Sequence, residues 1–380
     1  MLPNPTLNLS GERFTVLYGI RAATEAEALA RANDIAVEQT VEFPEELTPP
    51  GDIRHQVVGR IESCRPLGEE RYGVSISYAV ETAGNDLPQL LNVIFGNSSI
   101  KPGLRVERLE FPPGLLARYR GPRFGRAGLR ELLGVFDRPL LCTALKPMGL
   151  SPADLADLSY KCALGGIDII KDDHGLADQP FAPFWERVQR CAEAVDRANR
   201  ETGRRSIYMP NVTAQADRIL EAARFARQVG AGGLLISPGL TGLDAMRQLA
   251  DDDQIALPVM SHPALLGSFV VNPDSGISHY ALFGQLARLA GADATIYPNW
   301  GGRFSFSKPE CQAIADGTAV PMGGIRPVFP TPGGGMTLER IPELLEVYGR
   351  EVIFLVGGGL FRQGPDLVEN CRYFLKLIGG

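Results

Sequence analysis

Hydrophobic and polar positions follow two different rhythms along the chain, one before and one after about residue 120. In the first part, strand-like stretches at 13–20, 55–64, 71–80 and 104–112 are interrupted by helical stretches at 24–40 and 86–96. The resulting order of strand, helix, two strands, helix and strand is that of a ferredoxin-like α+β sandwich. We therefore predict a small N-terminal α+β domain over residues 1–125.

From residue 126 to residue 380, short apolar runs alternate with amphipathic segments. Eight runs have the length and composition of buried strands: 139–145, 167–171, 206–211, 232–237, 257–261, 294–298, 325–330 and 352–356. Helical stretches lie between them, among them 151–164, 183–201, 214–229 and 278–290. Eight strands that alternate with helices predict a (β/α)8 barrel. An open doubly wound sheet is less consistent with the pattern, because no GxGxxG follows the first of these strands.

Composition narrows the class of protein. The chain has 380 residues, of which 44% are hydrophobic and 22% charged, as in a globular protein with substantial cores. A net charge of -6 gives no reason to expect nucleic acid or an anionic membrane as a partner. Six cysteines without CxxC spacing predict reduced core thiols. The chain starts without a secretory signal pattern, and no apolar stretch approaches the roughly 20 residues that span a bilayer, so we expect a cytoplasmic protein.

Polar residues and glycines follow most of the predicted barrel strands. "LKPMG" with Lys146 and "KDDH" at 171–174 end the first two strands, Asn211 ends the third, and "SHP" with His262 ends the fifth. The last three strands end in "YPNWGGRF", "FPTPGGGM" and "LVGGG", whereas the opposite ends show no such pattern. Because barrel enzymes build their active sites at the carboxyl ends of the strands, we expect the active site there.

Two glycine runs follow the seventh and eighth predicted strands. Gly333 and Gly334 belong to the first run, Gly357 and Gly358 to the second, and Thr331 shortly precedes the first. Glycines let backbone N–H groups approach an anion closely, the following helix N-termini add positive dipole, and this pair of loops is the usual phosphate site of such barrels. Either run alone could simply serve a tight turn. We expect these five residues to bind the substrate and its phosphate.

The stretch from 121 to 188, which contains "LKPMG" and "KDDHGLADQPF", resembles the central part of the ribulose bisphosphate carboxylase large chain. It is more similar to the RuBisCO-like proteins, which share the fold without fixing carbon dioxide. The likeness extends over nearly the whole chain, from "VEQTVEFP" to "LVGGG". It implies a ferredoxin-like domain, a barrel, and a head-to-tail homodimer, or a higher oligomer, in which each N-terminal domain completes the partner's active site.

The resemblance makes Lys171 the lysine that reacts with carbon dioxide to form a carbamate, with Asp173 and His174 at the other two metal-ligand positions. A carbamate needs a neutral amine, which the apolar "IDII" before Lys171 favours. Mg2+ is the implied metal. Because the carboxylases have glutamate where this chain has His174, and imidazole suits later transition metals, Mn2+ or another divalent ion is an alternative. Two other readings stay open: His174 could face the substrate, and the run could be a solvated ion pair.

Other positions of the family's active site are changed. Lys146 matches the strand-one lysine that acts as acid or base near the reacting carbon, but Met148 replaces a second lysine. Arg303 stands roughly where the family has a lysine that steadies incoming carbon dioxide, and Tyr297 stands at the place of a histidine. These changes argue against carboxylase activity. His262 remains a catalytic candidate because of its place at the end of strand five.

Two residues of the N-terminal domain complete the expected site. Glu38 and Asn97 match positions that, in the family, contact the substrate from the partner subunit. Without the resemblance, Glu38 could be a solvated charge at a helix end and Asn97 a turn residue.

Lys146, a divalent metal and a phosphate cradle suit a reaction that passes through an enediolate. The main expectation is a carboxy-lyase that decarboxylates a phosphorylated sugar acid, 3-oxo-isoapionate 4-phosphate, to a ketotetrose phosphate and carbon dioxide. "VEQTVEFPEE" and "KDDHGLADQPF" most resemble the non-photosynthetic RuBisCO-like branch with that activity. The alternative is an enolase or isomerase that acts on a methylthio-sugar phosphate in methionine salvage. A silent barrel that only binds a phosphorylated metabolite is disfavoured, because binding alone does not require Lys146.

Overall fold

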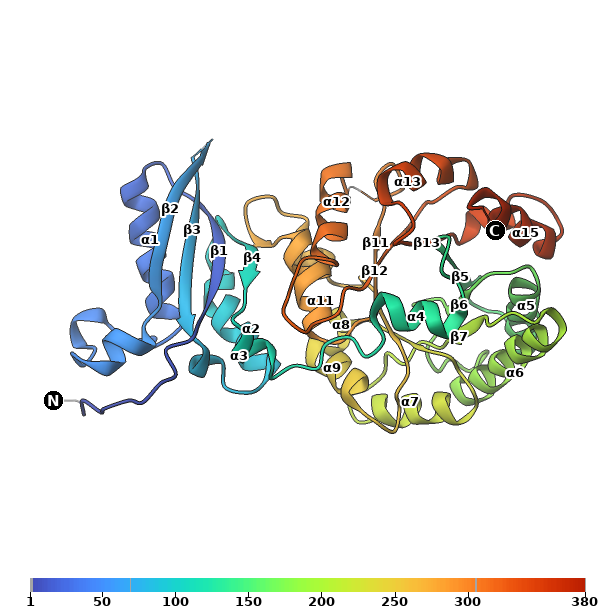
Figure 1. Ribbon diagram of the computed structural model, residues 1–380, viewed down its shortest axis with the longest axis horizontal. Helices are drawn as coiled ribbons and strands as arrows, with labels where there is room; N and C mark the ends of the chain where they lie inside the picture. The colour runs from blue at the N-terminus through green and yellow to red at the C-terminus, as the bar shows by residue number, and fades with distance from the viewer. Residues whose placement is uncertain (1–2, 69, 305, 380) are drawn as a thin grey trace. The chain divides into compact units, whose positions relative to one another are not determined.

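The computed structural model describes residues 3–68, 70–304 and 306–379, and Figure 1 traces its helices and strands. The chain forms two compact units. The first contains the residues up to Tyr119 together with Leu266–Gln285 and Met322–Gly324. The second contains Arg120–Leu265, Leu286–Pro321 and the residues from Ile325 onward. The chain thus returns twice to the first unit, whereas the sequence pattern predicts one boundary at residue 125.

The first unit is an α+β sandwich on a five-stranded sheet. Its main elements are β1 (Arg13–Arg21), α1 (Glu25–Glu38), β2 (Arg60–Gly68), β3 (Arg71–Ala79), α2 (Leu87–Phe95), β4 (Leu104–Glu110) and β10 (Gly276–Ile277). Short helical segments lie at Glu45–Leu47, Ile53–Val57, Val80–Ala83, Asn97–Ile100, Pro113–Leu116 and Gly267–Val270. The strand order is β10-β4-β1-β3-β2, with β1 antiparallel to β3 and β4 and with β10 parallel to β4. The predicted order of strands and helices is therefore present, with β10 as an added edge strand.

Alternation of buried positions explains β1 and α1. Phe14 and Val16 of β1 are fully buried, and every second residue faces the core at the start of the strand. Thr24 caps α1 by accepting a hydrogen bond from the backbone N–H of Glu27. The strand predicted at 55–64 starts later than expected. β2 begins at Arg60, and Ile53–Val57 forms a π-helical turn.

The second unit alternates strands and helices. Its strands are β5 (Leu140–Leu145), β6 (Ile169–Asp172), β7 (Ile207–Met209), β8 (Leu234–Ile236), β9 (Val259–Ser261), β11 (Ala294–Pro298), β12 (Phe329–Gly333) and β13 (Ile353–Leu355). Its longer helices are α4 (Gly125–Leu133), α5 (Pro152–Leu164), α6 (Phe184–Thr202), α7 (Ile219–Gln228), α9 (Leu243–Asp251), α12 (Lys308–Gly317), α13 (Ile341–Tyr348) and α15 (Leu367–Leu377). Short helices lie at α8 (Pro238–Thr241), α11 (Ala287–Leu289), η6 (Leu338–Arg340) and α14 (Gly358–Phe361).

The eight described strands of this unit are parallel and close into a ring. One four-stranded sheet runs β13-β5-β6-β7 and the other β12-β11-β9-β8. A parallel bridge between Asn211 and Leu235 joins β7 to β8. On the other side β12 lies against β13, because a Cβ atom added at Gly333 would come within 2.9 Å of Leu355. This closed arrangement is that of an α/β barrel.

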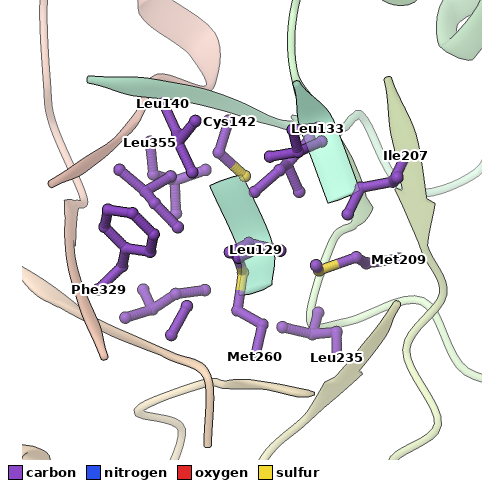
Figure 2. Packing of buried hydrophobic residues seen from close by; sticks show 14 residues of the cluster. Leu129, Leu133, Leu140, Cys142, Ile207, Met209, Leu235, Met260, Phe329 and Leu355 are labelled. Carbon is purple, nitrogen blue, oxygen red and sulfur yellow. The ribbon is translucent and has the colours of Figure 1, made fainter. Parts of the chain in front are cut away.

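The interior of the ring is filled by every second strand residue. Figure 2 shows Leu140 and Cys142 of β5, Ile207 and Met209 of β7 and Leu235 of β8 gathered in one buried cluster. Leu129 and Leu133 of α4 belong to the same buried cluster. Since the side-chain period of a strand is two, the next inward positions of each strand lie at its carboxyl end.

Two predicted elements differ from the structure. The strand expected at 325–330 begins at Phe329 and runs to Gly333, so Thr331 and Gly333 lie inside β12. The helix expected at 278–290 consists of a π-helical segment, Tyr280–Leu286, followed by the short α11. Tertiary contacts explain the second difference: the amide of Gln285 donates to the carbonyl of Leu109, and its oxygen accepts from the backbone N–H of Leu109. None of the described helices is long and apolar enough to cross a membrane.

A buried ion pair stabilises the start of β6. The guanidinium of Arg138 donates to both carboxylate oxygens of Asp168, at 2.7 and 2.8 Å, and the backbone N–H of Leu141 donates to the same carboxylate at 2.8 Å. Both charged side chains are nearly inaccessible, at 8% and 7% exposure. Removing one partner would leave the other charge buried and unpaired.

We predict that Asp168→Asn lowers the free energy of unfolding by about 3 kcal/mol, as breaking a buried pair does. Urea unfolding followed by circular dichroism measures this change. Asp253→Asn is the matched control, because Asp253 pairs with Arg120 and Arg123 while its side chain stays 69% exposed. The control should change stability little. Equal losses in the two variants would contradict the role given to burial.

Candidate active site

The candidate residues lie at one end of the barrel, and the period of two along each strand directs their side chains inward. Lys146 continues the inward positions of β5, and Lys171 and Asp173 continue those of β6 after Ile169. His262 follows inward Met260 of β9 at the same spacing. The contacts described below confirm that these side chains meet at the carboxyl ends of the strands, as barrel architecture predicts.

Lys171 is a buried amine. Its side chain is 2% exposed, and Nζ donates to the carbonyl oxygen of Asp172 at 3.0 Å. Burial lowers the pKa of Lys171, although the neighbouring Cys142 and Asp173 act in the opposite direction. A lowered pKa increases the neutral fraction of the amine, which is the form that can react with carbon dioxide. The reading of this lysine as part of a solvated ion pair is therefore wrong.

Asp173 joins two other candidates. Its Oδ1 accepts a hydrogen bond from Lys146 Nζ at 2.7 Å and lies 3.2 Å from His174 Nδ1. Burial alone would raise the pKa of Asp173, but the hydrogen bonds from His174 and Lys146 outweigh it and hold the pKa well below its usual range. Asp173 is thus ionised and stands between the amine of Lys146 and the imidazole of His174.

The two histidines stack. The rings of His174 and His262 are nearly parallel, at 10°, with centroids 4.4 Å apart. Burial, together with the charge of Lys171, lowers the pKa of His262 to about 2, so its imidazole is neutral. The backbone N–H of Ala264 donates to His262 Nδ1 at 3.2 Å. In the neutral ring the hydrogen must then be on Nε2, which makes His262 a hydrogen-bond donor at that atom.

Asp172 has a different environment from its neighbour. Its side chain points away from the barrel interior, is fully buried, and accepts hydrogen bonds from Arg187 Nε at 3.2 Å, from the hydroxyl of Tyr208 at 2.7 Å and from the backbone N–H of Asn211 at 3.0 Å. The amide of Asn211 in turn donates to the carbonyl of His174 at 3.0 Å. Asp172 and Asn211 therefore hold the end of β6 in place.

Lys171, Asp173 and His174 fit a divalent metal only if Lys171 is carbamylated. Among the described residues there is no group of three or more His, Cys, Asp and Glu side chains that could hold a metal ion. Asp173 and His174 supply two ligands, and a carbamate on Lys171 would supply an anionic oxygen as a third. The burial and lowered pKa of Lys171 are consistent with that modification. The ligand set thus remains a proposal that the geometry supports.

The first glycine run lies partly inside a strand. Gly333 is in β12, whereas Gly334 and Gly335 have φ of +75° and +100°, a backbone that glycine adopts without strain. Thr331 is fully buried, and its hydroxyl donates to the carbonyl of Phe329 at 3.4 Å. The hydroxyl of Thr331 is therefore directed to its own strand.

The second glycine run adjoins the lysine. A Cβ atom added at Gly357 would lie 3.8 Å from Lys146 Cε, and Gly358 has open space around it. The expected contribution of helix dipoles is small, because Gly357 precedes the four-residue α14 and β12 is followed by the three-residue η6. An anion here would depend on backbone N–H groups and on Lys146.

The loop after β11 is tied to the first glycine run. The backbone N–H of Asn299 donates to the carbonyl of Gly333 at 2.9 Å, and Arg340 donates to the carbonyl of Trp300 at 2.7 Å. A Cβ atom at Gly335 would lie 3.0 Å from the backbone nitrogen of Arg303. Arg303 is thus carried close to the glycine run, and its guanidinium lies over the ring of Phe304.

Tyr297 and Met148, which stand at changed positions of the family's active site, lie in different surroundings. Tyr297 alternates with inward Ile296 and is fully buried beside Tyr348 and Cys311, so it does not join the other candidates. Met148 is 49% exposed, and its Cε would lie 2.6 Å from a Cβ atom at Gly175.

Glu38 and Asn97 meet in the first unit. The amide of Asn97 donates to Glu38 Oε1 at 3.1 Å and to Glu42 Oε1 at 3.2 Å. Glu42, with φ of 45°, was not predicted. Glu42 lies beyond the end of α1, so no helical spacing in the sequence could have indicated it.

The fold and this site define an α/β-barrel enzyme class with its polar centre at the carboxyl ends of the strands. Residues 125–364 match the model of the ribulose bisphosphate carboxylase large chain, catalytic domain. The chain therefore belongs to the ribulose bisphosphate carboxylase large chain family, and it is similar to the RuBisCO-like members of that family.

Three relatives show the range of this similarity. The chain is 41% identical to ribulose bisphosphate carboxylase-like protein 1 of Rhodopseudomonas palustris over 96% of both chains. It is 40% identical to 5-methylthioribulose-1-phosphate isomerase of Rhodospirillum rubrum over 97% of both. It is 35% identical to 2,3-diketo-5-methylthiopentyl-1-phosphate enolase of Bacillus licheniformis over 85% of this chain and 80% of the relative.

Solved structures of the family have the same fold as this chain. A crystal structure of a Rubisco-like protein from Rhodopseudomonas palustris matches with a TM-score of 0.86 at 39% identity, over 96% of this chain and 97% of that one. A dimeric archaeal Rubisco from Hyperthermus butylicus matches with a TM-score of 0.86 at 27% identity, over 98% and 91%. The relatives above whose names state a reaction are an isomerase and an enolase of methylthio compounds, so the decarboxylation expected first has less support than its alternative.

We predict that substitutions of the two neighbouring aspartates have different effects, one on stability and the other on metal binding. Asp172→Asn should lower the free energy of unfolding by about 3 kcal/mol, because it unpairs buried Arg187. Asp173→Asn should leave urea unfolding close to that of the wild type and should abolish binding of Mg2+ or Mn2+ in the presence of bicarbonate. Urea unfolding and titration calorimetry measure the two effects. Metal binding by Asp173→Asn at wild-type affinity would remove Asp173 from the ligand set.

Proposed function

We propose that the protein is an isomerase that moves a proton between neighbouring carbons of a methylthio-pentulose 1-phosphate. The observation that carries this proposal is that two groups able to exchange hydrogen with a substrate, Lys146 and His262, meet at the same Asp173–His174 pair. Moving a proton along a carbon chain requires a group that carries the proton and a group that stabilises the carbonyl oxygen. The name of the Rhodospirillum rubrum relative supports the substrate class.

Each of the two groups has one role in this proposal. As the neutral amine, Lys146 removes the proton from the hydroxyl-bearing carbon beside the carbonyl and, as the ammonium, returns it to the former carbonyl carbon. The proton of the neighbouring hydroxyl group passes to the former carbonyl oxygen, which completes the isomer. Its Nζ lies 2.7 Å from Asp173, which keeps the amine directed toward the centre. His262 donates its Nε2 hydrogen to the carbonyl oxygen, because its Nδ1 is occupied by the N–H of Ala264. A neutral imidazole donor stabilises developing oxyanion charge without losing its own proton.

Lys171, Asp173 and His174 would hold the divalent metal. Bound there, the ion would act as a Lewis acid on the substrate oxygens. The residues behind them fix their direction: Asp172 and Asn211 hold the end of β6, and the His262 ring lies flat against His174. The backbone N–H groups of Gly334, Gly335, Gly357 and Gly358 and the side chain of Arg303 are proposed to bind the phosphate.

The methylthio enolase reaction is the second candidate, since it also begins with proton removal beside a carbonyl. Decarboxylation of 3-oxo-isoapionate 4-phosphate differs, because loss of carbon dioxide itself forms the enediolate. A single protonation of the enediolate carbon then completes the reaction. Carbon dioxide release therefore distinguishes decarboxylation from the other two reactions.

We predict that the enzyme, treated with bicarbonate and Mg2+ or Mn2+, converts 5-methylthioribulose 1-phosphate into an isomer of equal mass. Phosphorus and proton NMR follow the conversion, and carbon-labelled substrate should release no labelled carbon dioxide. Lys146→Met should lower kcat by about 10²-fold or more with little change in KM, as loss of a general acid–base group does. Lys161→Met is the control, because Lys161 forms an exposed pair with Asp157 on α5.

Two results would contradict this assignment. Consumption of 3-oxo-isoapionate 4-phosphate with release of carbon dioxide, and no change in the methylthio compound, would restore the decarboxylase. Normal turnover by Lys171→Ala or by exhaustively chelated enzyme would remove the metal from the mechanism.

The proposed site is shared between two subunits of a homodimer, to which Glu38 and Asn97 contribute from the partner's side. We predict that mixing Glu38→Gln subunits with Lys171→Ala subunits restores part of the activity, because one intact site forms in each heterodimer. Activity after unfolding and refolding the mixture measures this, with each variant refolded alone as control. Heterodimers that form and stay inactive would contradict the shared site.

A further inference from the structure

The turn after His262 holds one residue in a backbone conformation that its type avoids. Leu265 has φ of +67°, in the left-handed region, where a side chain with a Cβ atom is strained and glycine or asparagine is favoured. The side chain of Leu265 is also 58% exposed. Neither backbone preference nor burial explains a leucine here, and such outliers gather at functional sites.

The turn is attached directly to the proposed centre. The backbone N–H of Ala264, next to Leu265, donates to His262 Nδ1, and the His262 ring stacks on His174. The conformation of the turn therefore fixes the orientation of the His262 ring and, with it, where the leucine side chain stands relative to that ring.

Leu265 and the second glycine run are well separated around the ring, whereas the first glycine run, after β12, is two places from β9. Lys146 follows β5, and Gly357 beside it follows β13, which pairs with β5. In the order β5, β6, β7, β8, β9, the strand before Leu265 is four places from β5 in a ring of eight described strands. A substrate with its phosphate at Gly357 and Gly358 and its reacting carbons at Lys146 and His262 would extend toward this turn.

Met148 is another exposed apolar side chain next to the centre, and Phe304 and Phe361 beside the glycine runs are exposed as well. The terminal methyl group of Met148 rests against Gly175, which gives it a contact inside the protein. Its backbone is not among those with positive φ. Leu265 combines exposure with a strained backbone, so it is the stronger candidate for contact with a ligand.

We propose that Leu265 is a specificity-determining residue that contacts the apolar end of the substrate, the end away from the phosphate. The inference rests on the proposed function, in which the substrate has a phosphate at one end and a methylthio group at the other. Contact with leucine favours a thioether methyl group over a hydroxyl, because only the former gains from leaving water. Leu265 thus selects the methylthio compound over its 5-hydroxy analogue.

The test compares two substrates in four proteins. The substrates are 5-methylthioribulose 1-phosphate and ribulose 1-phosphate, and the proteins are the wild type, Leu265→Asn, Leu265→Gly and Leu240→Asn. Leu240 is the matched control, because it is 57% exposed after β8 without a positive φ. For each protein we would measure kcat and KM with both substrates, the Kd of each substrate by calorimetry, and the urea midpoint of unfolding.

We expect the wild type and Leu240→Asn to prefer the methylthio compound in kcat/KM. Leu265→Asn and Leu265→Gly should reduce that preference about tenfold, the size of effect that a small apolar group produces. The loss should appear in KM and Kd of the methylthio compound, with the constants for ribulose 1-phosphate unchanged. The urea midpoint should stay equal or rise, because both replacements suit the left-handed conformation.

Other outcomes distinguish failure of the proposed function from failure of the role given to Leu265. A wild type that turns over neither compound would contradict the proposed function itself. A wild type that prefers the methylthio compound, with the preference intact in both Leu265 variants, would overturn the role of Leu265 alone. Equal losses for both substrates would also overturn it, since the turn would then act only by orienting His262.

Discussion

The buried carboxylate of Asp172 is the contact on which the proposed centre depends. Arg187 from α6, Tyr208 from β7 and the backbone N–H of Asn211 just after β7 all bind it, so α6 and β7 both converge on the end of β6. With Asp172 directed outward, strand alternation directs its neighbours on both sides, Lys171 and Asp173, into the barrel. Loss of this anchor would release both residues together.

Burial then gives neighbouring residues different charges. Lys171 is buried without a carboxylate hydrogen bond of its own, and its pKa is lowered. Asp173 is ionised by its contacts with His174 and Lys146, and His262 stays neutral between His174 and the turn that follows it. An amine with a lowered pKa, an anionic carboxylate and a neutral imidazole donor in one place are the combination that favours carbamate formation, metal binding and proton transfer.

Much of this arrangement could be predicted along the chain, and some could not. The alternation of apolar strands and amphipathic helices indicated the barrel, and the residues after each strand indicated the position of the centre. Counting the period of two from Ile296 would also have shown that Tyr297 faces outward. By contrast, the shift of the seventh strand to Phe329 and the attachment of Leu266–Gln285 to the first unit depend on contacts with distant segments, such as that between Gln285 and Leu109.

The sequence by itself determined the order and type of most elements and the residue types at the carboxyl ends of the strands, because side-chain periodicity and glycine or proline positions act locally. Only the tertiary structure decided which of two adjacent aspartates anchors the strand and which faces the centre, how His262 is protonated, and that Leu265 is strained. These properties depend on burial and on hydrogen-bond partners from other elements, such as Arg187, Tyr208 and His174, which lie near in space and not in the chain.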